Sequence, residues 1–470
     1  MSRFAPVVPA AALLALALTA CSSSGVDGTP GGSGVRDPYF PKAGNGGYDA
    51  THYDLTLSYT PGARPLTARA TITARATQDL SAFNLDLQGL DVEKVTVDGT
   101  TARFNRAGQE LTVRPRDDLA EGRTFRVTVR YSGTPATITD PDGSEEGWLP
   151  TDDGALTLGQ PVGSMAWYPG NHHPSDKATY DIKVTVPRGL RAVSNGELRT
   201  ESTTGGRTTT SWHTAQPMAS YLATLAIGRY EISRTATPDR LPVYTAVDPT
   251  EADASRRVLA RLPEVIDWAE GLFGPYPFTT AGAIVERPGD FGYALETQTR
   301  PVFPGAPNMD LLVHELAHQW YGNSVTPESW QDMWLNESFA TYAEWLWAED
   351  HGGDTAQQIF DELYAGTHYP LPEDNRAVWS FPPGDPPDAA RISGPPVYDR
   401  GAMVLHRIRQ ILADDTAFRA LLRGWAGTHR HGNASTEDFT TYVERRAPDK
   451  DFDGVWEDWL YGEGKPERPR

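Results

Sequence analysis

Apolar and polar residues alternate with a period of two along residues 48–230. The alternating apolar positions include Tyr53, Leu55, Leu57, Phe83, Leu85, Leu87, Phe125, Val127, Val129, Ile182, Val184 and Val186. Turn-forming pairs such as Asp98-Gly99 and Asn195-Gly196 separate these runs. A period of two bounded by such pairs predicts half-buried antiparallel strands. We therefore expect an N-terminal antiparallel β-domain over residues 45–245.

The period changes after residue 248. Val258, Leu262, Val265, Ile266 and Ala269 would lie on one face of a helix, and Gly274-Pro275 ends this pattern. Helical patterns return between residues 401 and 459. This change predicts a second domain over residues 246–465, built largely of helices.

The first 20 residues have the pattern of a secretory signal, with one basic residue, Arg3, followed by an apolar run that is short for a membrane span. Leu18-Thr19-Ala20-Cys21 resembles the bacterial lipobox, in which the cysteine is lipidated and becomes the new N-terminus. Residues 21–44 are rich in Gly, Ser and Pro, which predicts a flexible tether. The expected protein is an extracytoplasmic lipoprotein of the bacterial cell membrane, held there only by lipid on Cys21.

The charge and the cysteine content of the chain limit the ligands and metal sites that it can have. The 470-residue chain has 42 Lys and Arg against 62 Asp and Glu, a formal net charge of −20. Such a charge repels phosphate, so nucleic acid is not an expected partner, and a cationic ligand is favoured. Cys21 is the single cysteine. An internal disulfide and a cysteine-ligated zinc site are therefore excluded.

The sequence Val313-His314-Glu315-Leu316-Ala317-His318 contains the strongest chemical signal. Histidines four residues apart stand on one face of a helix, where two imidazoles can converge on one metal ion. The glutamate between the two histidines can reach a water molecule beside that ion. We therefore assign His314 and His318 as candidate ligands of one Zn²⁺ ion and Glu315 as the candidate general base.

A catalytic zinc site needs a third protein ligand and one open position. The candidate is Glu337, which follows His318 after 18 residues and lies in the sequence Asn336-Glu337-Ser338-Phe339-Ala340. The gap allows one helix to end near Gly322 and a second helix to return antiparallel. Glu337, Thr341 and Glu344 would share a face of that second helix.

These motifs resemble the aminopeptidase N family of zinc metallopeptidases, the gluzincins. Further similar segments are Phe273-Gly274-Pro275-Tyr276-Pro277-Phe278, Gly292-Tyr293-Ala294-Leu295-Glu296-Thr297, Val397-Tyr398-Asp399-Arg400-Gly401-Ala402 and Pro217-Met218-Ala219-Ser220-Tyr221-Leu222. The resemblance covers residues 45–462 and implies an α+β multidomain protein, with the β-domain followed by a thermolysin-like peptidase domain. It also implies a short form without the family's large C-terminal helical domain.

The resemblance assigns roles to further residues. The Tyr398 hydroxyl would stabilise the oxyanion that forms when the peptide carbonyl is attacked. Glu296 and Gln160 would bind the free α-amine of a peptide substrate. The backbone of Ala294 and Leu295 would flank that substrate as an extended strand. Tyr293 stands where the family usually has glycine, so the preferred first residue of the substrate does not follow from the resemblance.

The sequence leaves two other functions open. The same zinc centre could serve an endopeptidase or another hydrolase. The chain could also be a surface binding lipoprotein with an inactive metal site, although each catalytic position holds a chemically competent residue. The function expected from the sequence is a zinc-dependent aminopeptidase that hydrolyses the N-terminal peptide bond.

Overall fold

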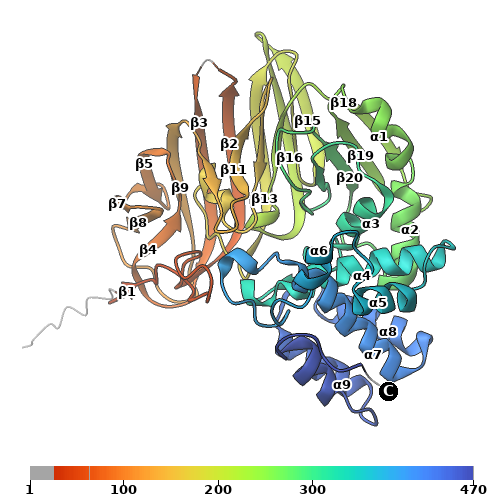
Figure 1. Cartoon of the computed structure of the whole chain (residues 1–470). Helices are drawn as coiled ribbons and strands as arrows, with labels where there is room; N and C mark the ends of the chain where they lie inside the picture. Colours follow the sequence, from red (N-terminus) through yellow and green to blue (C-terminus); the bar gives the residue numbers. More distant parts are fainter. Residues whose placement is uncertain (1–25, 63, 469–470) are drawn as a thin grey trace, which may run out of the picture.

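The computed structural model describes residues 26–62 and 64–468, so the predicted signal peptide and Cys21 lie outside the described residues. The chain forms a β-rich part followed by a part in which helices accompany a small mixed sheet (Figure 1). This architecture confirms the predicted α+β class. The strands are β1 (Thr29–Pro30), β2 (Tyr48–Thr60), β3 (Arg64–Ala76), β4 (Leu80–Asp86), β5 (Asp91–Val97), β6 (Thr100–Thr101), β7 (Arg103–Ala107), β8 (Glu110–Arg114), β9 (Thr124–Gly133), β10 (Thr137–Thr139), β11 (Glu145–Pro150), β12 (Ala155–Leu158), β13 (Lys177–Pro187), β14 (Arg191–Ser194), β15 (Glu197–Thr204), β16 (Arg207–Ala219), β17 (Leu225–Gly228), β18 (Glu231–Ala236), β19 (Pro242–Val247), β20 (Ala281–Val285), β21 (Val302–Phe303), β22 (Thr326–Pro327) and β23 (Asn433–Ala434). The helices are α1 (Ala252–Leu259), α2 (Leu262–Phe273), α3 (Met309–Ala317), α4 (Trp334–Asp350), α5 (Ala356–Ala365), α6 (Pro372–Ala377), α7 (Gly401–Leu412), α8 (Asp415–Thr428) and α9 (Thr436–Arg446).

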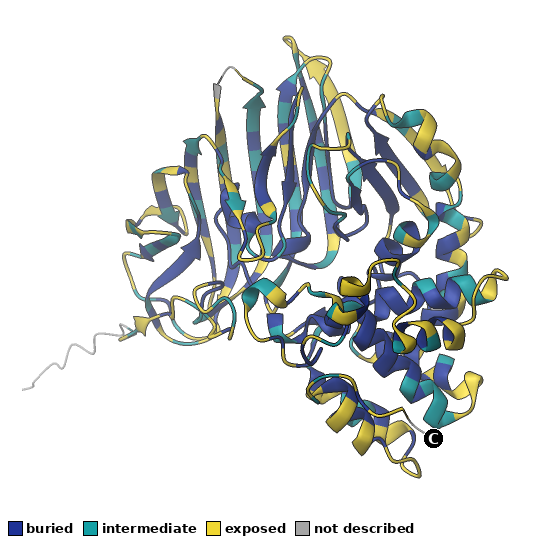
Figure 2. Cartoon of the chain, in the orientation of Figure 1, coloured by how far each residue is buried: buried dark blue, intermediate teal, exposed yellow. Residues whose placement is uncertain are grey.

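The largest sheet of the β-rich part has the strand order β15-β16-β13-β2-β3-β9-β5-β6. Its strands alternate in burial as the sequence predicts: Tyr53, Leu55 and Leu57 of β2 are buried, and the intervening residues are more exposed (Figure 2). A second sheet, in the order β10-β11-β12-β17-β14, lies where the β-rich part meets the helices. Its β10–β11 hairpin and the residues after β12 reach the cavity described below.

A mixed sheet begins the second domain, in the order β18-β19-β20-β21. Strands β19 and β20 are parallel, and α1 and α2 form the crossover between them. Parallel neighbouring strands need such a crossover connection. The change in the sequence from a period of two to a helical period therefore marks the crossover between β19 and β20. The domain boundary predicted between residues 245 and 246 falls inside β19. Because β18 pairs with β19 and β19 pairs with β20, all three strands belong to the second domain, and the division lies near Gly228.

Residues 26–47, which we name the N-terminal strap, differ from the flexible tether predicted up to residue 44. Asp37 is 4% exposed, and its carboxylate accepts hydrogen bonds from the Trp330 backbone N–H at 2.9 Å and from His173 Nε2 at 3.1 Å. The Tyr39 hydroxyl donates to the Pro386 carbonyl at 2.6 Å. The strap is therefore part of the folded body and joins its two domains.

A half-buried lysine also joins the two domains. Lys177, the first residue of β13, donates through Nζ to the backbone carbonyls of Asn323, Ser324 and Gly432 at 2.9–3.1 Å. Hydrogen bonds from a charged donor are stronger than those between neutral groups, so this contact fixes the β-domain against the loop that follows α3. None of the helices in the described part of the chain has the length and apolar character needed to cross a membrane.

Candidate zinc active site

Two antiparallel helices present the metal-binding side chains. Helix α3 begins at Asn308, whose side chain accepts a hydrogen bond from the Leu311 backbone N–H at 2.8 Å. An asparagine at this position satisfies one of the free N–H groups of the first turn and fixes where the helix starts. His314 and Glu315 lie on α3, His318 caps its C-terminus, and Glu337 lies in the first turn of α4.

The three predicted ligands converge. Glu337 Oε2 lies 3.3 Å from Nε2 of His314 and 3.3 Å from Nε2 of His318. Zinc bonds of about 2.0–2.1 Å in tetrahedral geometry separate neighbouring ligand atoms by about 3.3 Å. His314, His318 and Glu337 are all buried, and their ligand atoms lie within 4.8 Å of one another. The donor set therefore fits one Zn²⁺ ion with an open position.

The second nitrogen of each imidazole is held by the protein. His314 Nδ1 donates to Glu344 Oε1 at 2.6 Å, and His318 Nδ1 donates to the Tyr321 carbonyl at 3.0 Å. These bonds fix the tautomer in which Nε2 is free to bind a metal ion. Glu344 was placed by sequence on the face of Glu337, but its contact with His314 was not predicted. The sequence feature that could have indicated this contact is the position of Glu344, seven residues after Glu337 and two turns further along the same helix face.

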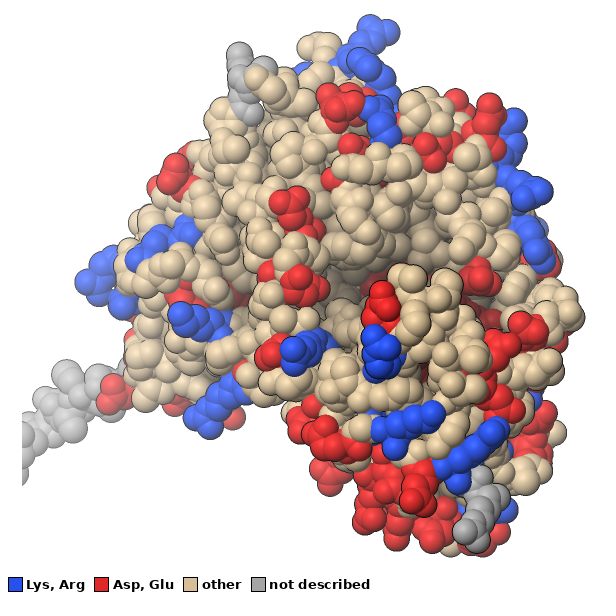
Figure 3. All heavy atoms as spheres, viewed as in Figure 1, with Lys and Arg blue, Asp and Glu red and all other residues tan. Residues whose placement is uncertain are grey.

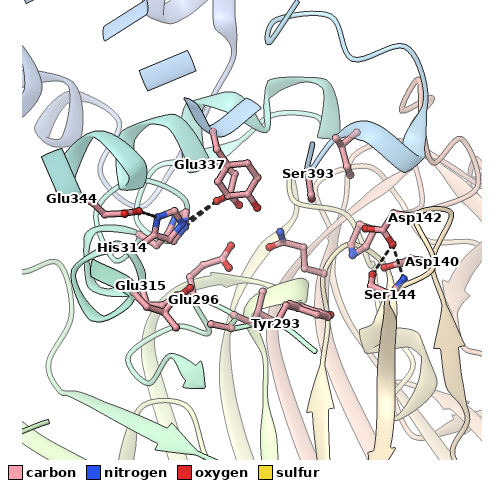
Figure 4. A pocket seen from close by; sticks show the side chains of 18 of the residues that line it. Asp140, Asp142, Ser144, Tyr293, Glu296, His314, Glu315, Glu337, Glu344 and Ser393 are labelled. Atoms are coloured by element: carbon pink, nitrogen blue, oxygen red, sulfur yellow. Dashed lines mark hydrogen bonds and ion pairs between the residues drawn. The ribbon is translucent and has the colours of Figure 1, made fainter. Parts of the chain in front are cut away.

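Two carboxylates beside the ligands have oxygens that no other described residue satisfies. Glu315 Oε2 and Glu296 Oε1 are buried and lack a hydrogen-bond partner in the described part of the chain. Both side chains line a cavity of about 700 Å³ that also contains the three ligands. Burial raises the pKa of Glu296 to about 7, so a cationic partner in the cavity would favour its charged form. Figure 4 shows Glu296 and Glu315 close to His314 and Glu337.

The residues after His318 hold the segment that carries Glu296. Asn323 Nδ2 donates to the Glu296 carbonyl at 2.6 Å, and Gln319 Nε2 donates to the same carbonyl at 3.3 Å. Leu295 exchanges backbone hydrogen bonds with Val302. Ala294 and Leu295 therefore line the cavity as extended backbone beside Glu296. The roles of Gln319 and Asn323 carry no signal in the sequence because they act on a backbone group more than 20 residues away.

Tyr398 and Gln160, which come from different domains, line the same cavity. The Tyr398 ring stacks on His314, with 6.0 Å between ring centroids and 17° between planes. Burial raises the pKa of Tyr398 well above its usual value, so its hydroxyl remains a donor. Gln160 follows β12 of the β-domain and lines the cavity, and its Oε1 has no partner within the described residues. All the residues predicted for the site thus surround one cavity, with the exception of Cys21, which is outside the described chain.

A close contact between α4 and α7 sets the position of Tyr398. The Ser338 hydroxyl, next to Glu337, donates to the Val397 carbonyl at 2.7 Å. A Cβ atom on Gly401 would overlap that hydroxyl, so glycine lets α7 approach α4. This contact was not predicted from the sequence, since it depends on how the two helices pack.

Two helix-borne imidazoles and a carboxylate define a zinc-dependent metallopeptidase when Glu315 lies beside them with an oxygen that no described residue satisfies. Comparison of the sequence with models of known protein families supports this class. Residues 49–222 match the model of the peptidase M1 N-terminal domain, and residues 298–459 match that of the peptidase family M1 domain. The chain belongs to peptidase family M1. The predicted relationship and the Zn²⁺ cofactor are thereby confirmed.

Individual relatives extend the comparison. Leukotriene A-4 hydrolase from Xenopus laevis is 26% identical over 89% of this chain and 72% of its own length. The probable aminopeptidase 2 of Sulfurisphaera tokodaii is 24% identical over 81% of this chain, which spans half the length of that relative. A mutant M1 zinc metallopeptidase from Deinococcus radiodurans, solved with a Tyr-Ser-Ala substrate, superposes with a TM-score of 0.83 at 29% identity, covering 93% of this chain and 99% of that one.

Proposed function

We propose that the protein is a zinc-dependent aminopeptidase that removes the N-terminal residue of peptides. The carrying observation is the buried Glu296 carboxylate, whose Oε1 atom has no partner among the described residues and which lines the same cavity as the metal-binding cluster. A carboxylate in that position suits the cationic α-amine of a peptide, and its place beside the metal ligands limits the cleavable bond to the first one. The M1 relatives named as aminopeptidases support this assignment.

His314, His318 and Glu337 would hold the zinc ion. When bound, zinc supplies Lewis acidity, which makes water more acidic and polarises a peptide carbonyl. Glu344 and the Tyr321 carbonyl orient the two imidazoles through Nδ1. Proton transfer and substrate orientation are then carried out by other side chains of the protein.

Glu315 is the general base in this proposal. One of its carboxylate oxygens is buried without a partner, which leaves it available to accept a proton from the attacking water. The same carboxyl group then donates that proton to the departing amine. The Tyr398 hydroxyl donates a hydrogen bond to the carbonyl oxygen as negative charge develops on it.

Substrate orientation comes from both domains. The Glu296 carboxylate and Gln160 Oε1 accept hydrogen bonds from the α-amine, and Ala294 and Leu295 flank the substrate as extended backbone. The Gln160 contribution means that the β-domain completes the site. Peptides with a free N-terminus are therefore the proposed substrates.

A matched pair of substrates distinguishes this function from an endopeptidase on the same centre. A peptide and its N-acetylated form differ only in the amine that Glu296 would bind. We expect the free peptide to be cleaved at least about 100-fold more efficiently, and Glu296→Gln to reduce that ratio strongly. Equal cleavage of both peptides would favour the endopeptidase.

We also propose that the protein is an extracytoplasmic lipoprotein anchored through Cys21. The support is the signal-like segment and the Leu18-Thr19-Ala20-Cys21 sequence. Metabolic labelling with a fatty-acid analogue tests the anchor. Label on the wild-type protein and none on Cys21→Ala is the expected result, and equal labelling of both would contradict it.

A further inference from the structure

One end of the active-site cavity is acidic. It is formed by Asp140, Asp142 and Ser144 from the β10–β11 hairpin, and Tyr293 and Gln160 line the same cavity. Figure 4 shows Asp140, Asp142 and Ser144 grouped across the cavity from His314 and Glu337. Figure 3 shows both acidic and basic side chains near the hollow between the two parts of the molecule.

Asp140 is the buried member of this group. Its side chain is 8% exposed, and its Oδ1 atom has no hydrogen-bond partner in the described structure. Behind it lies Glu146, which is fully buried and accepts hydrogen bonds from the backbone N–H groups of Gly163 at 2.7 Å and Val162 at 3.2 Å. Asp140 and Glu146 interact directly, and burial raises the pKa of both, that of Asp140 to about 7.

No basic side chain compensates these acids. Among the ion pairs of residues 26–62 and 64–468, none includes Asp140, Asp142 or Glu146. A buried carboxylate without a cationic partner is costly, and the raised pKa of Asp140 and Glu146 reflects this cost by favouring their neutral forms. A cation that enters the cavity would stabilise the charged form of Asp140. Such a group therefore indicates a place where a cation from outside the chain would be bound.

The hairpin holds the acidic end rigidly. The Asp140 backbone N–H donates to the Ser144 carbonyl at 2.9 Å, and Asp142 Oδ1 accepts from both the backbone N–H and the hydroxyl of Ser144 at 2.7–2.8 Å. Tyr293 adds a hydroxyl with no partner among the described residues, and burial raises its pKa, with smaller contributions from the charges of Glu146, Asp140 and Glu296. Tyr293 thus lies between Glu296 and the acidic pair, and its ring offers an apolar wall.

The first residue of a substrate has three groups to place. In the proposed function, Glu296 and Gln160 bind its amine, and Tyr398 and the zinc ligands face its carbonyl. Its side chain must leave in a third direction. Tyr293 lies between Glu296 and Asp140 in the cavity (Figure 4), so a long side chain can run along the Tyr293 ring and place its terminal charge at Asp140.

We infer that the acidic end selects substrates whose first residue is arginine or lysine, with Asp140 as the carboxylate that pairs with the cationic side chain. This inference rests on the proposed aminopeptidase function. It assigns a specificity role to the β10–β11 hairpin, which lies in the β-domain rather than among the peptidase motifs. The buried Glu146 acts on Asp140, and Asp142 lies at the rim.

Arginyl and citrullyl anilides test the inference because the two side chains have nearly the same shape and only arginine is charged. The wild-type enzyme should show a kcat/KM at least about tenfold higher for the arginyl anilide. Asp140→Asn should reduce this ratio to below about threefold, while hydrolysis of a leucyl anilide stays within about threefold of wild type. Glu145→Gln is the matched control, since Glu145 is exposed on the same hairpin, and it should leave the ratio unchanged.

Three results would overturn the inference. They are equal turnover of arginyl and citrullyl anilides by the wild type, a wild-type preference for the leucyl substrate over the arginyl one, and an equal loss of both activities in Asp140→Asn. Hydrolysis of leucyl anilide without a preference for arginine would refute the specificity and leave the aminopeptidase function standing. If no anilide is hydrolysed, the proposed function fails. Calorimetric binding of arginine amide against citrulline amide to the zinc-loaded protein then decides the specificity, with equal affinities counting against it.

Discussion

Glu344 on α4 accepts a 2.6 Å hydrogen bond from Nδ1 of His314 on α3. This bond leaves the other ring nitrogen of His314 directed at Glu337, 3.3 Å away. The zinc site is therefore pre-oriented by a residue that does not bind the metal. Glu344 lies two helical turns beyond Glu337, so α4 supplies both the third ligand and the residue that orients His314.

Removing the Glu344 carboxylate should weaken metal binding. We expect Glu344→Gln to lower the affinity for zinc by about 10- to 100-fold, because the His314 ring loses its charged acceptor and part of its basicity. Competition with a chelator of known affinity measures the change. Glu231→Gln, an exposed substitution of the same kind on β18, is the control. An unchanged chelator midpoint for Glu344→Gln would show that this bond does not tune the site.

Loss of the Tyr398 hydroxyl should affect turnover and spare metal binding. Tyr398→Phe retains the ring that stacks on His314 and removes one donor to the developing oxyanion. Removal of such a donor lowers kcat by about 10²–10³, and we expect a loss in that range with an unchanged zinc content. Steady-state kinetics with metal analysis of the same sample checks both. A variant that keeps more than half of the wild-type kcat would remove Tyr398 from the mechanism.

Acid should release the N-terminal strap. Burial opposes ionisation of Asp37, but hydrogen bonds from His173 and from the backbone N–H groups of Trp330, Phe40 and Tyr39 hold its pKa below the usual 3.8. A carboxyl group with a lowered pKa in the folded state stabilises the fold above its unfolded pKa, and this stabilisation is lost as pH falls through the folded value. The contribution of Asp37 is therefore complete at neutral pH, begins to fall near pH 4 and is lost as pH falls through the lower pKa of the folded state.

Asp37→Asn isolates this effect. We expect the substitution to lower the free energy of unfolding at pH 7 by about 1.5–3 kcal/mol, the range for hydrogen bonds to a charged group, and to lower it less below pH 4. Thermal unfolding followed across pH measures both values. Because Phe40 of the strap lines the active-site cavity, the variant should also raise KM. A stability difference that is the same at pH 3 and pH 7 would contradict the role given to the Asp37 charge.

The zinc ligands could be predicted from sequence because their geometry is local. His314 and His318 share a helix face through a four-residue spacing, and Glu337 lies on the neighbouring helix in the chain. The β-domain was predictable for a similar reason, since alternation reports burial strand by strand. Alternation does not report which sheet a strand joins. That is why the boundary predicted at residues 245/246 falls inside β19.

The N-terminal strap and the acidic end of the cavity could not be predicted in the same way. The strap has the glycine and proline content of a linker, and its order depends on Asp37 meeting His173 and Trp330, which are distant in sequence. Asp140 lies in an ordinary turn sequence, and only the approach of the β10–β11 hairpin to Tyr293 gives it a place in the cavity. Long-range packing sets both features.

The most direct test of the central claim compares wild type and Glu315→Gln in the hydrolysis of aminoacyl anilides with defined zinc content. The account predicts that the wild type releases amino acids, loses activity on chelation and regains it with one equivalent of zinc. It predicts that Glu315→Gln binds zinc equally well and loses about 10²–10⁴-fold in kcat. A zinc-loaded wild type without turnover of any aminoacyl substrate, or a Glu315→Gln variant with wild-type kcat, would contradict it.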